Sequence, residues 1–203
     1  MNTKKKRTPK NIKLIDVVNK INKWNIPIVV DDSNVTRERN KEIGPVYFDP
    51  DNGGATAKIH IVDYTINDFK SYFRQDEYIY NVTKDMIDEV LTGDYHVAFA
   101  LACFVFLHEV GHWIQFQEDG QDLSVYSKRD DECRKAYKIQ ENKIDQLMDS
   151  YRKNGYNSLD YYKLLPKISE LQKQKREIPM EKEADQFAKQ HLVEAMALCR
   201  KIR

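Results

Sequence analysis

The most chemically distinctive stretch of the sequence is His108-Glu109-Val110-Gly111-His112, an HExxH pattern. On an α-helix, His108 and His112 lie one turn apart on the same face, so both imidazoles can bind one Zn²⁺ ion. Glu109 lies about 100° further round the helix, where it can accept a proton from zinc-bound water. The pattern therefore predicts a zinc site with Glu109 as its general base.

The sequence before this motif favours a metal site over a surface helix end. The motif follows the apolar run Val97 to Leu107, and we expect one long helix from Tyr95 to about Glu118. A helix that is apolar on all sides is buried in a soluble protein, and buried histidines and carboxylates are costly without partners. The alternative is a helix end that faces water and carries hydrogen-bonded histidines.

A catalytic zinc site needs a third protein ligand and keeps its fourth position open. Glu118 stands where a metzincin would have its third histidine, but that family also needs a glycine at the position of Gln115. The metzincin arrangement is therefore excluded, and the third ligand is expected further along the chain.

The last helix, expected to begin near Pro179, offers three acids for this role. At 100° per residue, Glu181 lies about 60° from the apolar face that contains Ala184, whereas Glu183 and Asp185 each lie about 100° away on opposite sides. We therefore predict Glu181 as the metal ligand, Asp185 as hydrogen-bond acceptor for a zinc-bound histidine and Glu183 as reserve ligand. The alternative is an acidic cluster favoured by the helix dipole.

The two motifs together resemble the ImmA/IrrE-type zinc metallopeptidases. HEVGH is followed by E-K-E-A-D-Q-F-A, close to a second motif of roughly E-x-E-A-(N/D)-x-F-A. The resemblance covers residues 11–126 and 179–203. It implies a gluzincin-like site with His108, His112 and a glutamate of the second motif as ligands and Glu109 as base. It also implies a zincin-like domain whose edge strand binds an extended peptide.

Further elements are expected around this core. An amphipathic helix is predicted from Asn11 to Trp24, a strand from Ile28 to Val30, and a β-hairpin from the strands at 46–48 and 57–62, joined by a turn at 49–54. Thr83 is predicted to cap a helix that runs through Leu91. The expected fold class is α+β and mostly helical: a small β-sheet packed on the HExxH helix.

The two motifs are separated by more residues than we expect for this family. Charged helices are predicted at 134–153 and 159–175, with a break at Asn154-Gly155. We interpret residues 127–178 as an inserted helical hairpin, which could select substrates, dock a partner, form a dimer or be passive. Residues 1–10 are predicted to be a basic, disordered tail.

Composition narrows the class of protein. The 203 residues include 33 Lys and Arg against 32 Asp and Glu, which excludes a globally basic nucleic-acid binder. A basic arm at residues 4–10 is only a weak nucleic-acid signal. Three cysteines without a CxxC pattern fit a reducing compartment. An apolar run of 11 residues is short for a membrane span. We therefore expect a cytoplasmic protein without a membrane partner, of unknown oligomeric state.

The remaining histidines and cysteines fit structural roles better than chemistry. His191 is too far along its helix from Glu181 to share its metal, His60 and His96 are isolated, and Cys103 is expected in the core.

The leading hypothesis is a zinc-dependent endopeptidase. By the family resemblance, its substrate is an intracellular regulatory protein, such as a repressor-like transcriptional regulator of a phage or mobile element. The alternatives are a non-catalytic, zinc-stabilised protein-binding module, or a metal hydrolase that acts on a non-protein amide.

Overall fold

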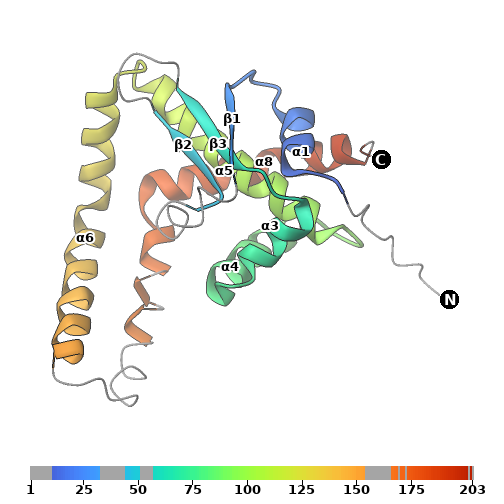
Figure 1. The fold of residues 1–203 in the computed structure, drawn as a ribbon. Coiled ribbons are helices and arrows are strands. Elements are labelled where there is room, and N and C mark those ends of the chain that lie inside the picture. The colour runs from blue at the N-terminus through green and yellow to red at the C-terminus, as the bar shows by residue number, and fades with distance from the viewer. Residues whose placement is uncertain are drawn as a thin grey trace. The chain divides into compact units, whose positions relative to one another are not determined.

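The structure is a computed structural model that describes residues 11–32, 44–50, 57–153, 166–168, 170–171, 173–200 and 202. It is α+β and mostly helical, as the sequence predicts (Figure 1). The elements follow in the order α1 (Leu14–Ile21), β1 (Ile28–Asp31), β2 (Val46–Asp49), β3 (Lys58–Val62), α3 (Ile66–Phe73), α4 (Glu77–Asp88), α5 (Val97–Glu118), α6 (Leu123–Lys153) and α8 (Pro179–Cys199). The basic tail predicted at residues 1–10, the turn residues 51–54 and the break at Asn154-Gly155 lie outside the described residues.

The chain divides into two compact units. One contains Met1–Ile114 together with Ala184–Arg203, and the other contains Gln115–Glu183. Helices α5 and α8 each have part of their length in either unit. The predicted insertion at 127–178 falls within the second unit.

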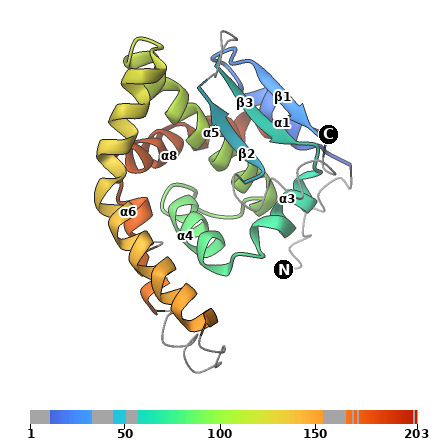
Figure 2. The same ribbon diagram turned by 60° about the vertical axis from the view of Figure 1, so that its left-hand side comes forward.

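The sheet has three strands in the order β1-β3-β2, with β3 between the other two in both views (Figures 1 and 2). Strand β1 is parallel to β3, and β2 is antiparallel to it, with Val46 opposite Ile61 and Phe48 opposite Ile59. The predicted hairpin strands are therefore confirmed. Ile59 and Ile61 are buried on the face that packs into the core.

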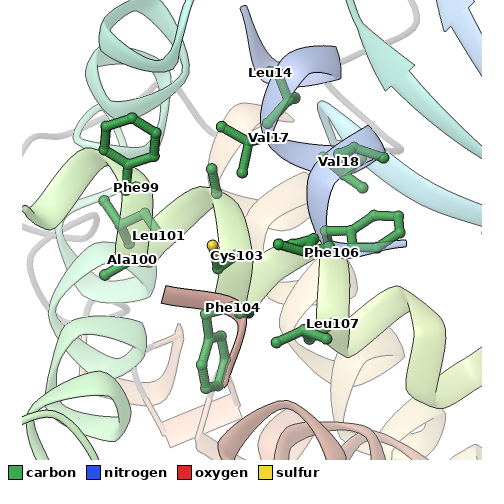
Figure 3. Packing of buried hydrophobic residues seen from close by; sticks show 14 of the residues in the cluster. Leu14, Val17, Val18, Phe99, Ala100, Leu101, Cys103, Phe104, Phe106 and Leu107 are labelled. Atoms are coloured by element: carbon green, nitrogen blue, oxygen red, sulfur yellow. The ribbon is translucent and has the colours of Figure 1, made fainter. Parts of the chain in front are cut away.

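The core of this first unit is formed by α1, the sheet and the apolar half of α5, together with buried residues of α3, α4 and α8. Figure 3 shows Leu14, Val17 and Val18 of α1 beside the side chains of α5. Residues 100–104 of α5 are buried on every side of the helix. The prediction of one long helix that ends at Glu118 is confirmed, with its start at Val97.

Helix α5 is also the one helix of the described residues that is long and apolar enough to cross a membrane. Of its most apolar 18-residue window, 72% is buried inside the protein. In this it resembles the core helix of a soluble protein. The cytoplasmic location stays a prediction.

Helix α1 is shorter than predicted because its ends are held by other interactions. Lys13 forms an isolated antiparallel bridge with Thr65, so the chain before Leu14 is extended. After Ile21, the Asn22 side chain bonds both the N–H and the C=O of Ile26 and closes a turn.

The N-cap predicted at Thr83 for the helix that corresponds to α4 was wrong. Thr83 lies buried inside α4, and the helix begins at Glu77, where the Asp76 carboxylate accepts a hydrogen bond from the Ile79 N–H at 3.0 Å. Helix α3, capped by Thr65, was not predicted at all. Both Asp and Thr are good N-cap residues, so residue type alone did not decide between the two positions.

Helix α6 begins earlier than predicted, at Leu123 instead of residue 134. The Asp122 carboxylate caps it by accepting hydrogen bonds from the Ser124 and Val125 N–H groups at 2.8 and 3.3 Å. Of the second predicted charged helix, residues 166–168, 170–171 and 173–176 are helical, and residues 159–165 lie outside the described part.

The corrected cap makes a testable prediction. Asp76→Ala removes the acceptor and is expected to lower the free energy of unfolding by about 1 kcal/mol. Asp76→Asn keeps an acceptor oxygen and should cost much less. Urea unfolding followed by circular dichroism measures both values. Equal losses in the two variants would contradict a capping role.

Candidate metal centre

The two histidines of the HExxH motif lie side by side near the end of the apolar part of α5. Each is only 9% exposed. Their Nε2 atoms are 3.2 Å apart, and the rings meet edge to face. Two nitrogens held about 2.0–2.1 Å from a tetrahedral Zn²⁺ lie about 3.3–3.4 Å apart. The separation of the two Nε2 atoms is therefore close to the one that a shared zinc ion requires.

Asp185 of α8 fixes the orientation of the first histidine. Its Oδ1 lies 2.8 Å from Nδ1 of His108, and its side chain is 8% exposed. With Nδ1 donating to this carboxylate, the tautomer of His108 has its lone pair on Nε2, the nitrogen beside His112. The predicted pairing of Asp185 with a ligand histidine is present in the structure.

Glu181 completes a group of three possible ligands. One ligand atom from each of His108, His112 and Glu181 lies within 4.8 Å of the others, and all three residues are buried. Two imidazoles and one carboxylate are a donor set that suits Zn²⁺ and leaves one coordination position for water or substrate. This buried cluster could bind a metal ion, and its residues fit zinc.

The position of Glu181 follows from where α8 packs against α5. A Cβ atom built on Gly111 would lie 2.7 Å from the Cα of Ala184, so the two backbones approach each other at this glycine. Asp185 comes directly after Ala184, and Glu181 precedes Asp185 by about one helical turn. The contact at Gly111 therefore sets the register that brings both acids toward the histidines.

Gln115 holds the beginning of α8. Its Nε2 donates to the Met180 carbonyl at 2.8 Å and to Oε2 of Glu183 at 3.1 Å. This role of Gln115 is not evident from the sequence, because no local pattern marks a side chain that bonds a backbone 65 residues away.

The general-base candidate, Glu109, contacts the sheet. Its Oε2 accepts a hydrogen bond from the Phe48 N–H at 2.8 Å, and the residue is partly exposed. In an antiparallel ladder a backbone N–H points either to the partner strand or away from it. The Phe48 N–H is bonded to Glu109, so it points away from β3, toward the outer edge of β2.

The other acids considered for the metal lie elsewhere. Glu183 is 57% exposed and pairs with Arg129 of α6 at 2.9 Å, and Glu118 is exposed. Neither belongs to the buried group.

The remaining histidines are engaged in other contacts. His60 stacks on Tyr47 and lies 3.0 Å from Asp31, and His191 packs edge to face on Trp24. Burial, and next the charge of Lys70, lower the pKa of His96 below its usual value.

A basic residue of α6 also contacts the candidate ligand. Nη2 of Arg134 lies 2.5 Å from Oε1 of Glu181. Burial by itself lowers the pKa of the Arg134 guanidinium, but the carboxylates of Glu181 and Asp130 outweigh it and raise the pKa overall. The guanidinium is therefore a permanent positive charge beside the metal cluster.

No protein-family model, curated protein or solved structure matches the chain. The function is therefore inferred from the residues of the metal centre.

The first prediction for this centre concerns its third ligand. Purified wild-type protein is expected to contain one zinc ion per chain, and Glu181→Ala should lose it because one of three buried donors is gone. Elemental analysis after gel filtration measures the content. Glu183→Ala is the matched control, an acid two residues away on the same helix, and should retain its zinc. Loss of zinc in Glu183→Ala but not in Glu181→Ala would show that Glu183, and not Glu181, is the ligand.

The second prediction concerns Gly111. In an exposed helix, Gly→Ala stabilises by about 1 kcal/mol. Here the new methyl group would meet the backbone of α8, so we expect Gly111→Ala to destabilise the protein. The free energy of unfolding should fall by about 1–3 kcal/mol, and zinc binding should weaken. Denaturant unfolding and zinc titration measure the two effects. Glu118→Ala, on the exposed side of the same helix, is the control. A stabilised Gly111→Ala variant would refute the close approach.

Proposed function

We propose that the protein is a zinc-dependent endopeptidase. The observation that carries the proposal is the position of Glu109: it follows the buried ligand His108 directly in α5, and its carboxylate is bonded to the outer edge of β2. A base beside a buried metal cluster and a strand edge suits the hydrolysis of a bond in an extended backbone.

The residues of the site would divide the work as follows. His108, His112 and Glu181 hold the ion, and Asp185 keeps His108 in the required tautomer. When bound, the ion supplies a Lewis acid that polarises the substrate carbonyl and lowers the pKa of water. Glu109 accepts the proton of the attacking water and passes it to the leaving amine.

Strand β2 supplies a place for the substrate backbone. Within the described residues β2 pairs only with β3 and is an edge strand, and extended peptides commonly bind along such edges. The Phe48 N–H on this edge also bonds Glu109, so a peptide docked there passes next to the base. This arrangement favours a peptide over a small amide as the substrate.

The resemblance to the ImmA/IrrE-type metallopeptidases agrees with this proposal. It rests on HEVGH and on the second motif that contains Glu181 and Asp185. By that resemblance we propose a zincin-like core and, as substrate, an intracellular regulatory protein of the repressor type.

The test is the substitution of the base. Glu109→Gln keeps the shape of the side chain but removes its ability to accept a proton. We expect zinc content to stay at the wild-type level while hydrolysis falls by about 10²–10⁴-fold. Zinc content is measured by elemental analysis, and hydrolysis by mass spectrometry of new termini in a mixture of proteome-derived peptides.

The outcomes separate the hypotheses. Internal cleavage by the wild type and none by Glu109→Gln supports the endopeptidase. A zinc-loaded wild type that cleaves no peptide would overturn it and favour a binding module or a hydrolase of other amides. Loss of zinc from Glu109→Gln would show that Glu109 holds the metal, contrary to the role assigned here.

A further inference from the structure

Arg134 of the long helix α6 contacts Glu181, the candidate metal ligand on α8. Nη2 of Arg134 lies 2.5 Å from Oε1 of Glu181, and the two side chains are 22% and 10% exposed. Surface ion pairs contribute little because water solvates both partners. This pair is mostly shielded from water, so its geometry restrains both side chains.

Arg134 is itself held in place. Its Nε donates to Oδ1 of Asp130, one turn earlier on α6, at 2.6 Å. The planar guanidinium therefore forms a fork between an acid of its own helix and Glu181. A lysine in this position carries the same charge but has one nitrogen and no fixed plane, so it cannot reproduce the fork.

We propose that Arg134 is a positioning residue for the metal centre, which holds one carboxylate oxygen of Glu181 so that the other is presented to the ion. A glutamate side chain loses considerable rotamer freedom when it becomes a ligand. Arg134 restricts that freedom before the metal arrives, and it neutralises a carboxylate that is buried in the absence of an ion. Metal affinity thus depends on α6, although α6 contributes none of the three ligands in the cluster.

The neighbouring arginine provides a comparison within the same pair of helices. Arg129 of α6 also pairs with an acid in the first turns of α8, at 2.9 Å, but that acid is the exposed Glu183. It also pairs with Asp119 at 3.2 Å. The two arginines differ chiefly in whether their partner on α8 belongs to the metal cluster.

The inference rests on the metal centre of the proposed function and not on hydrolysis. It is tested with the full-length protein, stripped of metal and titrated with Zn²⁺ against a chromophoric chelator. Arg134→Ala is expected to weaken zinc binding by about 10–100-fold, the usual effect of losing an outer partner of a ligand. Arg129→Ala should stay within about twofold of the wild type, because its partners Asp119 and Glu183 lie outside the metal cluster. Arg134→Lys should fall between the two.

A purely structural role of Arg134 is distinguished by two further measurements. Visible absorption of the Co²⁺-loaded protein reports the ligand set, and we expect it to change in Arg134→Ala but not in Arg129→Ala. The unfolding midpoint of the metal-free protein should be similar in the two variants. If Arg134→Ala does not fold, Arg134→Gln, which keeps a side chain of similar length without the charge, takes its place in the titration.

Several results would overturn the inference. One is a zinc affinity of Arg134→Ala equal to that of Arg129→Ala, and another is an unchanged Co²⁺ spectrum of Arg134→Ala. A third is tighter zinc binding by Arg134→Ala than by the wild type, which would show that Arg134 competes with the metal for Glu181. A wild type that binds no zinc would instead remove the metal centre itself, and with it the proposed function. A wild type that binds zinc but cleaves nothing leaves the role of Arg134 standing.

Discussion

The close approach of α5 and α8 at Gly111 is the constraint on which the metal centre depends. No residue with a Cβ fits there without displacing the backbone at Ala184. Because a helix is rigid over one or two turns, this single contact fixes which residues of α8 meet the motif. It places Asp185 against His108 and directs the turn that contains Glu181 to the same side. Gly111, the second variable position of HExxH, thus determines how closely α8, the helix that contains Glu181, approaches the motif.

The polar residues of the centre also explain why an ion is expected. Helix α5 changes from a fully apolar core segment to one that buries His108, His112 and Gln115 within little more than two turns. Glu181 and Asp185 are only 7% and 6% exposed. Buried groups of this kind are stable only when they are paired. The structure pairs Asp185 with His108 and Glu181 with Arg134, and it holds the Nε2 atoms of the two histidines 3.2 Å apart, a separation that suits two ligands of one cation.

Much of this centre could be read from the sequence because it depends on local periodicity. The HExxH spacing, the apolar run before it and the start at Pro179 indicated α5 and α8, and helical angles ranked Glu181 ahead of Glu183, which is also how burial separates them in the structure. The hairpin strands followed from two short runs, at 46–48 and 57–62, on either side of a turn cluster. These features involve residues close in sequence, whose relation is set by one element.

What the sequence did not reveal depends on the packing of distant elements. The contact of Gly111 with Ala184, the bond from Gln115 to Met180 and the ion pair of Arg134 with Glu181 each join residues 47 to 73 positions apart. Helix α3 and the true start of α4 were missed for a different reason: several residues in that stretch can cap a helix, and tertiary packing chose among them.

The two sides of α5 connect binding with chemistry. One side of the motif carries His108 and His112 toward α8, where burial and fixed partners suit a tightly held ion. Glu109, about 100° round the helix, is partly exposed and bonded to an edge strand, where a substrate backbone can arrive. A structural zinc site is closed by four protein ligands, whereas this cluster offers three and the Glu109 carboxylate is bonded to the Phe48 N–H. This asymmetry between a buried cluster of possible metal ligands and a partly exposed carboxylate on the same helix supports the hydrolytic function that we propose.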